Sequence, residues 1–79
     1  MKTKVIITLK NGVLDPQGKA IEGALAGLGF TGVDNVRQGK FIELDVDAAN
    51  ADDARTRVEA MCEKLLSNTV IENYRVEVE

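Results

Sequence analysis

The stretch KNGVLDPQG, residues 10–18, joins an extended segment to a helix and decides how the rest of the chain is arranged. Gly12 permits the positive φ angle that a chain leaving a strand often adopts. Asp15 is suited to cap the following helix with its carboxylate, and Pro16 fits the first helical position, where an N–H has no intrahelical partner. Val13 and Leu14 form an apolar pair within this turn, which indicates contact with another surface.

The size of the chain limits how much apolar surface it buries. Its 79 residues suffice for one domain, spanning residues 1–79. Such a domain buries only about 60% of the surface that its unfolded chain exposes, so its stability is marginal. Phe30, Phe41 and Tyr74 are the only aromatic residues, so the core must be built from Val, Ile, Leu and Ala. Self-association, as a dimer or a higher even-numbered oligomer, would bury further apolar surface.

Charge and composition exclude several classes of partner. The net charge of −3 argues against nucleic-acid binding, which normally requires a basic face. The apolar run Val5–Ile7 is too short for a membrane span or a signal-peptide core. A single cysteine, Cys62, allows no internal disulfide. These features predict a cytoplasmic protein.

The sequence contains no histidine, so it lacks the usual general base and the commonest metal ligand. Cys62 has no visible activating base, and we expect it to be a small buried hydrophobic residue. The four aspartates near the second predicted helix lack the glycine-containing spacing of a calcium loop, so capping and solvated roles are favoured. We therefore expect no catalytic, cofactor-binding or metal-binding residue in this chain.

The pattern of apolar residues predicts the order β-α-β-β-α-β. Its most common compact form is an α+β, ferredoxin-like fold, with a four-stranded antiparallel sheet and both helices on one face. The predicted strands are Thr3–Leu9, Val33–Gln38, Lys40–Asp47 and Val70–Val78, and the predicted helices are Pro16–Leu28 and a second that begins after Asn50 and ends near Ser67.

The first predicted helix carries an apolar stripe at helical spacing, which we expect to be buried: Ile21, Ala24, Leu25 and Leu28. Gly23 and Gly27 lie beside it, although each interior glycine costs roughly 1 kcal/mol relative to alanine. Close packing within the same subunit is the favoured explanation, and contact with another subunit is the alternative. Gly29 is expected to stop the helix in the left-handed conformation, with Phe30 folding back onto the core.

The second predicted helix is capped by Asn50. Its apolar stripe comprises Ala54, Val58, Met61, Cys62, Leu65 and Leu66. Ile6 makes the second face of the first strand partly apolar, as a lone exposed residue or as a face that a partner covers.

Gln38-Gly39 predicts a tight hairpin between the second and third strands. Arg37 and Lys40 flank its tip. Two cations at a turn are usually solvated, and the alternative is that they bind an anion or an acidic partner surface. Together with Val13 and Leu14, they are the candidate subunit-interface residues.

Five segments, spread from the first predicted strand to the last, carry a family resemblance: Leu9–Gly18, Leu28–Phe30, Val36–Lys40, Cys62–Leu66 and Val70–Tyr74. They closely resemble the PurS family, the small subunit of the multi-subunit phosphoribosylformylglycinamidine synthase of bacterial purine biosynthesis. The first segment is the most specific. Thr69 stands where a proline is often found in the family.

The resemblance implies membership of a complex that converts formylglycinamide ribonucleotide, glutamine and ATP into formylglycinamidine ribonucleotide, glutamate, ADP and phosphate. It implies three partners: another copy of this chain, a glutaminase subunit that releases ammonia, and a large synthetase subunit that uses the ammonia with ATP and Mg. The small subunit is then expected to bridge the other two and assist ammonia transfer, with no activity alone and no cofactor of its own.

A competing interpretation is a free-standing small-ligand-binding or regulatory module, whose paired sheets would form a binding cleft. The fold alone does not decide, because many unrelated activities share it. Capture of a large synthetase and a glutaminase as partners would separate the two interpretations.

Overall fold

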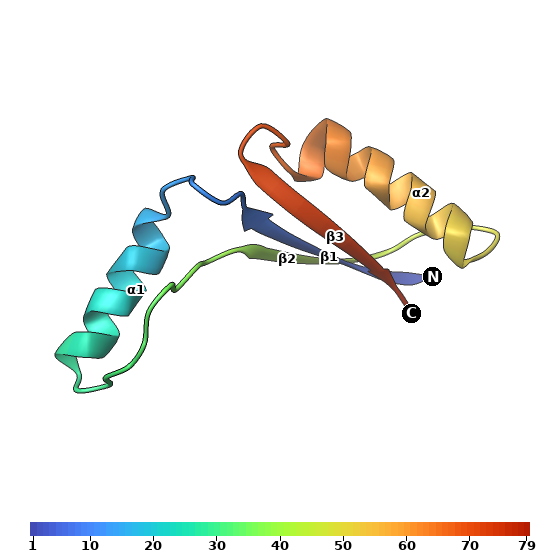
Figure 1. Ribbon diagram of the computed structural model, residues 1–79. Coiled ribbons are helices and arrows are strands. Elements are labelled where there is room, and N and C mark those ends of the chain that lie inside the picture. Colours follow the sequence, from blue (N-terminus) through green and yellow to red (C-terminus); the bar gives the residue numbers. More distant parts are fainter.

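The computed structural model describes residues 1–79, which form a three-stranded antiparallel sheet and two α-helices (Figure 1). The elements are β1 (Lys2–Leu9), α1 (Pro16–Gly27), β2 (Lys40–Asp45), α2 (Ala51–Met61), the π-helical turn η1 (Cys62–Leu66) and β3 (Glu72–Val78). The strand order is β2-β1-β3. The chain is elongated, with extents of 50 × 25 × 15 Å.

β1 is the central strand, and its alternation sets the core. Thr3, Val5 and Ile7 point to the same face and are fully buried. Val5 lies opposite Ile42 on β2 and opposite Val76 on β3, so one apolar row crosses all three strands. The predicted strands at both ends of the chain, and the one that begins at Lys40, are therefore confirmed.

α2 covers this apolar face of the sheet. Its N-terminus is capped as expected, because the Asn50 side chain accepts a hydrogen bond from the Asp53 N–H over 2.8 Å. Ala54, Val58 and Cys62 are fully buried against the sheet. Met61 and Leu65 belong to the apolar stripe predicted for this helix, but both remain exposed where the helix gives way to η1.

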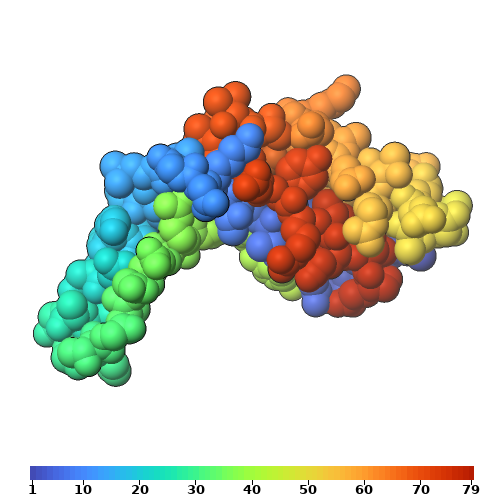
Figure 2. Space-filling model, in the orientation of Figure 1, coloured from blue at the N-terminus to red at the C-terminus, as the bar shows by residue number.

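α1 projects away from the sheet instead of covering it (Figure 1). Together with the returning segment it forms an arm, residues 16–36, which stands apart from the body made by the sheet and α2 (Figure 2). Because the arm has no layer beneath it, the predicted burial of its apolar stripe is wrong for three of the four residues, and only Leu25 is half-buried. Leu28 is 74% exposed and Ile21 is exposed as well.

The end of α1 follows one prediction and departs from another. Gly29 has φ +93°, so the expected left-handed helix stop is confirmed. Phe30 does not fold back onto the core and is 59% exposed. At Gly23 and Gly27 an added Cβ would meet nothing within 4 Å, so the favoured explanation, close packing within the same subunit, is wrong.

The predicted strand Val33–Gln38 is absent, and so is the hairpin at Gln38-Gly39. Two backbone N–H groups of this segment donate to side chains of the arm and its base and not to a neighbouring strand. Val36 donates to Glu22 Oε1 over 3.2 Å, and Gln38 donates to Asp15 Oδ2 over 2.7 Å. The sheet therefore has three strands and one covering helix, and the predicted four-stranded ferredoxin-like arrangement is not formed by the single chain.

Candidate subunit interface

The arm joins the body through two short segments, residues 10–15 and 37–40, which we call the neck. The first contains the turn predicted from the sequence: the Val13 N–H donates to the Lys10 carbonyl oxygen over 3.2 Å, and Gly12 has φ +85°. This turn half-buries Val13 but leaves Leu14 72% exposed. Leu14 is therefore an apolar side chain for which the single chain supplies no contact surface.

The two candidate cations also lie at the neck, although no hairpin is present. The Arg37 guanidinium donates to the Lys10 carbonyl oxygen over 3.2 Å, so it ties the returning segment to the turn that carries Val13 and Leu14. Lys40 Nζ lies 3.5 Å from Glu72 on β3. Both cations remain exposed, so they can still reach a partner surface. The structure thus brings Val13, Leu14 and Arg37 together and places Lys40 on the body side of the neck.

Asp15 does more than cap α1. Its Oδ1 accepts a hydrogen bond from the Gly18 N–H over 2.9 Å, which confirms the predicted cap. Its Oδ2 accepts a second bond from the Gln38 N–H, so the carboxylate joins the two segments of the neck. The bond from Gln38 and then the bond from Gly18 hold the pKa of Asp15 below its usual value. Asp15 is 5% exposed, which makes it the one buried carboxylate of the chain.

Two glycines, at the start of the arm and in the neck, allow backbone segments to approach each other closely. A Cβ at Gly18 would lie 2.4 Å from the Val36 carbonyl oxygen, and a Cβ at Gly39 would lie 2.4 Å from the Ile7 carbonyl oxygen. Both distances are below contact distance, so neither position accepts a side chain without a backbone shift.

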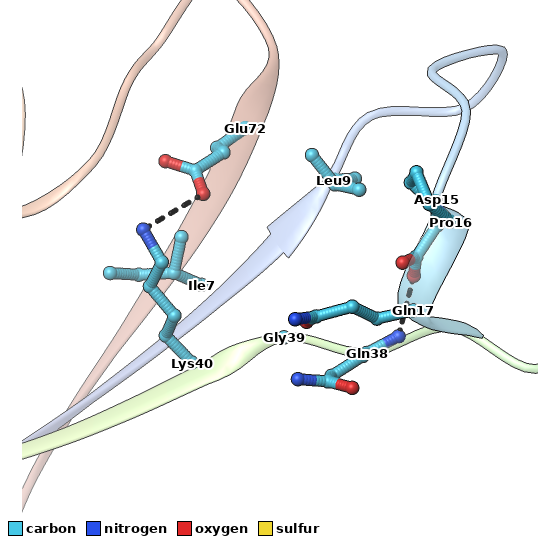
Figure 3. Close-up of a pocket in the computed structure, with 9 residues that line it drawn as sticks. All are labelled: Ile7, Leu9, Asp15, Pro16, Gln17, Gln38, Gly39, Lys40 and Glu72. Carbon is cyan, nitrogen blue, oxygen red and sulfur yellow. Dashed lines mark hydrogen bonds and ion pairs between the residues drawn. The ribbon is translucent and has the colours of Figure 1, made fainter. Parts of the chain in front are cut away.

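A groove of about 330 Å³ lies between the neck and the open end of the sheet (Figure 3). Ile7 and Leu9 form its apolar part, and the ion pair between Lys40 and Glu72 lies on one side. The hydrogen bond between Asp15 and Gln38 lies on the opposite side (Figure 3). The polar groups on both sides of the groove are thus already paired with each other, by an ion pair on one side and a hydrogen bond on the other.

The structure contains no cluster of side chains suited to bind a metal ion. No group of three or more His, Cys, Asp or Glu side chains is placed to hold a metal ion, and no helix is long and apolar enough to cross a membrane. Cys62 is fully buried in the core, as expected, and burial raises the pKa of its thiol, helped by the nearby carboxylates of Glu59 and Glu63. A buried thiol with a raised pKa is a poor nucleophile.

Sequence reasoning missed the cross-link made by Asp15 and the close approach at Gly18 and Gly39. An Asp-Pro pair at the start of a helix predicts only a cap. The bond from Gln38 to Asp15 joins residues 23 positions apart, so no pattern in the sequence around Asp15 indicates it. The glycines did carry a signal: Gly18 stands in the first turn of a helix, where a glycine has no capping role.

The fold and the neck define a class of protein: a small α+β domain whose arm and one sheet face are not covered by its own chain. A family model for PurS, described as phosphoribosylformylglycinamidine (FGAM) synthase, matches residues 2–79. The chain belongs to the PurS family.

Individual relatives agree with this assignment over nearly the whole chain. The synthase subunit PurS of Bacillus subtilis is 50% identical over 78 residues, covering 99% of this chain and 92% of the relative. The crystal structure of PurS from Methanocaldococcus jannaschii, a subunit of formylglycinamide ribonucleotide amidotransferase in the purine biosynthetic pathway, superposes with a TM-score of 0.90 at 45% identity, covering 99% and 94% of the two chains.

A third similarity is to a chain in the structure of PurLQS from Thermotoga maritima. Its TM-score is 0.88 at 37% identity, covering 96% of this chain and 93% of that chain. The similar chain is therefore found together with the other subunits of such a complex.

Proposed function

We propose that this chain is the small subunit of phosphoribosylformylglycinamidine synthase, where it bridges the glutaminase and the large synthetase subunit and assists ammonia transfer between them. The observation that carries this proposal is membership of the PurS family over residues 2–79. The structure adds support, because it leaves uncovered the arm and the sheet face that carries the apolar pair Ile6 and Phe41. We place the complex in the cytoplasm, and we assign the use of ATP and Mg to the large subunit.

The chemistry explains why a subunit without reactive groups is needed. Ammonia in water near neutral pH is mostly protonated and is then no longer nucleophilic. The two active sites must therefore be held in register, with a closed path between them, so that ammonia reaches its acceptor before it is lost. Holding reacting partners in a fixed geometry is itself a large contribution to rate.

Self-association is part of the proposal. Only 10 of the 79 residues are buried, and the exposed large apolar residues cluster on the arm and at the edges of the body. The arm alone exposes Ile21, Leu28, Phe30 and Val33. A second copy of the chain would supply the layer that the arm lacks, as small domains often require.

The neck is the proposed docking surface for the larger subunits. Leu14 offers an exposed apolar contact. Arg37, which is bonded to the same turn, and Lys40, on the body side of the neck, offer two exposed long cations. Arginines at protein interfaces are often energetically important, and like charges placed opposite each other cost several kcal/mol. The double change Arg37→Glu, Lys40→Glu reverses both charges and removes the Arg37 to Lys10 bond, so it tests whether this part of the neck is needed for docking.

The experiment is capture of the glutaminase and synthetase subunits by the tagged small subunit. We expect the wild-type chain to retain both, and the double variant to remain a folded oligomer but to retain neither well. Lys19→Glu is a control, because it reverses an exposed cation of the arm that lies outside the neck. Normal capture by the double variant would return Arg37 and Lys40 to a solvated role. Failure of the wild-type chain to capture either partner would favour a free-standing module.

A further inference from the structure

The direction of the arm depends on very few interactions. α1 makes no extended contact with the sheet or with α2 of its own chain, so packing within the chain does not hold it in place. At the neck, two hydrogen bonds link its two segments: Gln38 to Asp15, and Arg37 to Lys10. The second is exposed, whereas the first involves a carboxylate that is 5% exposed.

The Asp15 carboxylate is matched to its two donors. Oδ1 accepts from Gly18 and Oδ2 accepts from Gln38, so both oxygens must be acceptors. An asparagine at this position would turn an NH₂ group toward one of the two N–H donors and would lose that bond. A serine would keep a helix cap with its single oxygen, but it is too short to serve Gln38 as well.

The backbone around this carboxylate leaves little space for a second arrangement. Val36 lies against Gly18 at a distance that excludes a Cβ, and Gly39 lies against Ile7 in the same way. The start of the arm, its return and the central strand are therefore in close contact around Asp15. Loss of the Asp15 to Gln38 bond would leave the returning segment held by two longer hydrogen bonds, from Val36 to Glu22 and from Arg37 to Lys10, each 3.2 Å.

We propose that Asp15 is a positioning residue, which fixes the direction of the arm relative to the sheet and thereby the register of the two larger subunits. Only the part about the register of the two larger subunits rests on the proposed bridging function. The fixed direction of the arm is a property of the chain itself and is testable separately.

Spin-label distances test the direction of the arm. Labels are placed at Thr31→Cys, at the far end of the arm, and at Asp47→Cys, on the body, in a Cys62→Ala background; both sites are exposed and make no hydrogen bond or ion pair. Dilution with unlabelled chain removes distances between copies. We expect one narrow distance distribution with Asp15 present, and a clearly broadened or shifted distribution for Asp15→Asn and Asp15→Ser, both in the purified chain and in the reconstituted complex.

Controls separate positioning from capping. Asn50→Ala removes the cap of α2. The Asn50 side chain bonds only to Asp53 in the same helix, so this change is expected to leave the distance distribution unchanged. Asp15→Ser is expected to keep the helix content, measured by circular dichroism, because serine is a good cap. A narrow, unshifted distribution in both Asp15 variants would overturn the proposed role of Asp15.

The second readout is the ratio of glutamine-dependent to ammonium-dependent synthesis in the reconstituted complex. We expect Asp15→Ser to lower this ratio about tenfold or more, because small misplacements of reacting partners cost large factors in rate. An unchanged ratio despite a broadened distance would overturn the link to subunit register. If the wild-type chain itself fails to support glutamine-dependent synthesis, the proposed function falls, and the distance measurement still decides the role of Asp15.

Discussion

Ile6 and Phe41 lie directly opposite each other on β1 and β2, on the face of the sheet that α2 does not cover. Phe41 is 56% exposed, and Ile6 is half-buried. Cross-strand apolar pairs stabilise a sheet, but an exposed pair on an otherwise polar face also offers a contact surface. The apolar character that Ile6 gives to this face is thus extended by a second strand, which favours a face covered by a partner over a lone exposed residue.

Phe41→Glu is expected to weaken self-association without unfolding the chain, because it places a carboxylate in an apolar contact and leaves the core face intact. We expect the dissociation constant of the oligomer to rise at least about tenfold, or about 1.4 kcal/mol. Sedimentation equilibrium measures it. Glu43→Gln, on the same strand and the same face, is the control. An unchanged oligomer in Phe41→Glu would place the self-contact elsewhere, with the arm as the next candidate.

The glycines of α1 are expected to respond in opposite directions to alanine. Gly23→Ala should raise the free energy of unfolding by about 0.8–1 kcal/mol, because the added Cβ meets nothing and alanine favours a helix. Gly18→Ala should lower it, since the Cβ would clash with the Val36 carbonyl oxygen and the Asp15 carboxylate. Urea denaturation of both variants at low protein concentration decides. Destabilisation by Gly23→Ala would mean that this face of the arm is already occupied.

The local elements followed from the sequence because their signals are local. Strand alternation around Val5, the caps at Asp15 and Asn50, and the left-handed Gly29 were all predicted and are all present. The predicted burial of Ile21 was wrong. An apolar stripe on a helix indicates that this face is to be covered, but not whether the same chain or another chain covers it. The segment Val33–Gln38 has strand composition, but side chains of the arm and its base take two of its backbone donors.

The candidate site was predicted in part. Val13 and Leu14 were singled out as an apolar pair in a turn, and Leu14 is indeed exposed at the neck. Arg37 and Lys40 were placed at a hairpin that does not exist, yet both lie where the arm meets the body. Their roles in docking remain predictions, since they concern a surface on another chain.

Cys62→Ala should cost about 1 kcal/mol of stability or somewhat more, because it removes a fully buried side chain from the core beside Val58. Glutamine-dependent synthesis by the complex should stay near the wild-type rate. The native thiol should also react slowly with a thiol reagent until the chain is unfolded. Loss of activity in a folded Cys62→Ala protein would reveal a chemical role.

Acid should destabilise the chain through carboxylates whose pKa values are lowered in the folded state. Bonds from Gln38 and Gly18 lower the pKa of Asp15, and a bond from the Ala49 N–H lowers that of Asp53. The stability that these groups contribute is complete above their unfolded values of about 4 and is lost as pH falls through the lower folded values. The free energy of unfolding should therefore be nearly constant above about pH 5 and decline below about pH 4.

Denaturant titrations across this pH range test the assignment. Asp15→Asn should show a shallower acid decline than the wild-type chain, because it removes one of the responsible groups. Asp47→Asn, which changes an exposed carboxylate without a hydrogen bond or ion pair, should leave the decline as it is. Equal declines in all three proteins would show that Asp15 contributes nothing to the acid sensitivity.

The most direct test of the bridging role is to omit this chain from a mixture of the purified glutaminase and synthetase subunits, and to measure formylglycinamidine ribonucleotide formation with glutamine and, separately, with an ammonium salt. We predict that omission abolishes synthesis from glutamine and leaves synthesis from ammonium largely intact, with full recovery when the chain is added back. Equal loss of both activities, or no loss of the glutamine-dependent one, would contradict the bridging role.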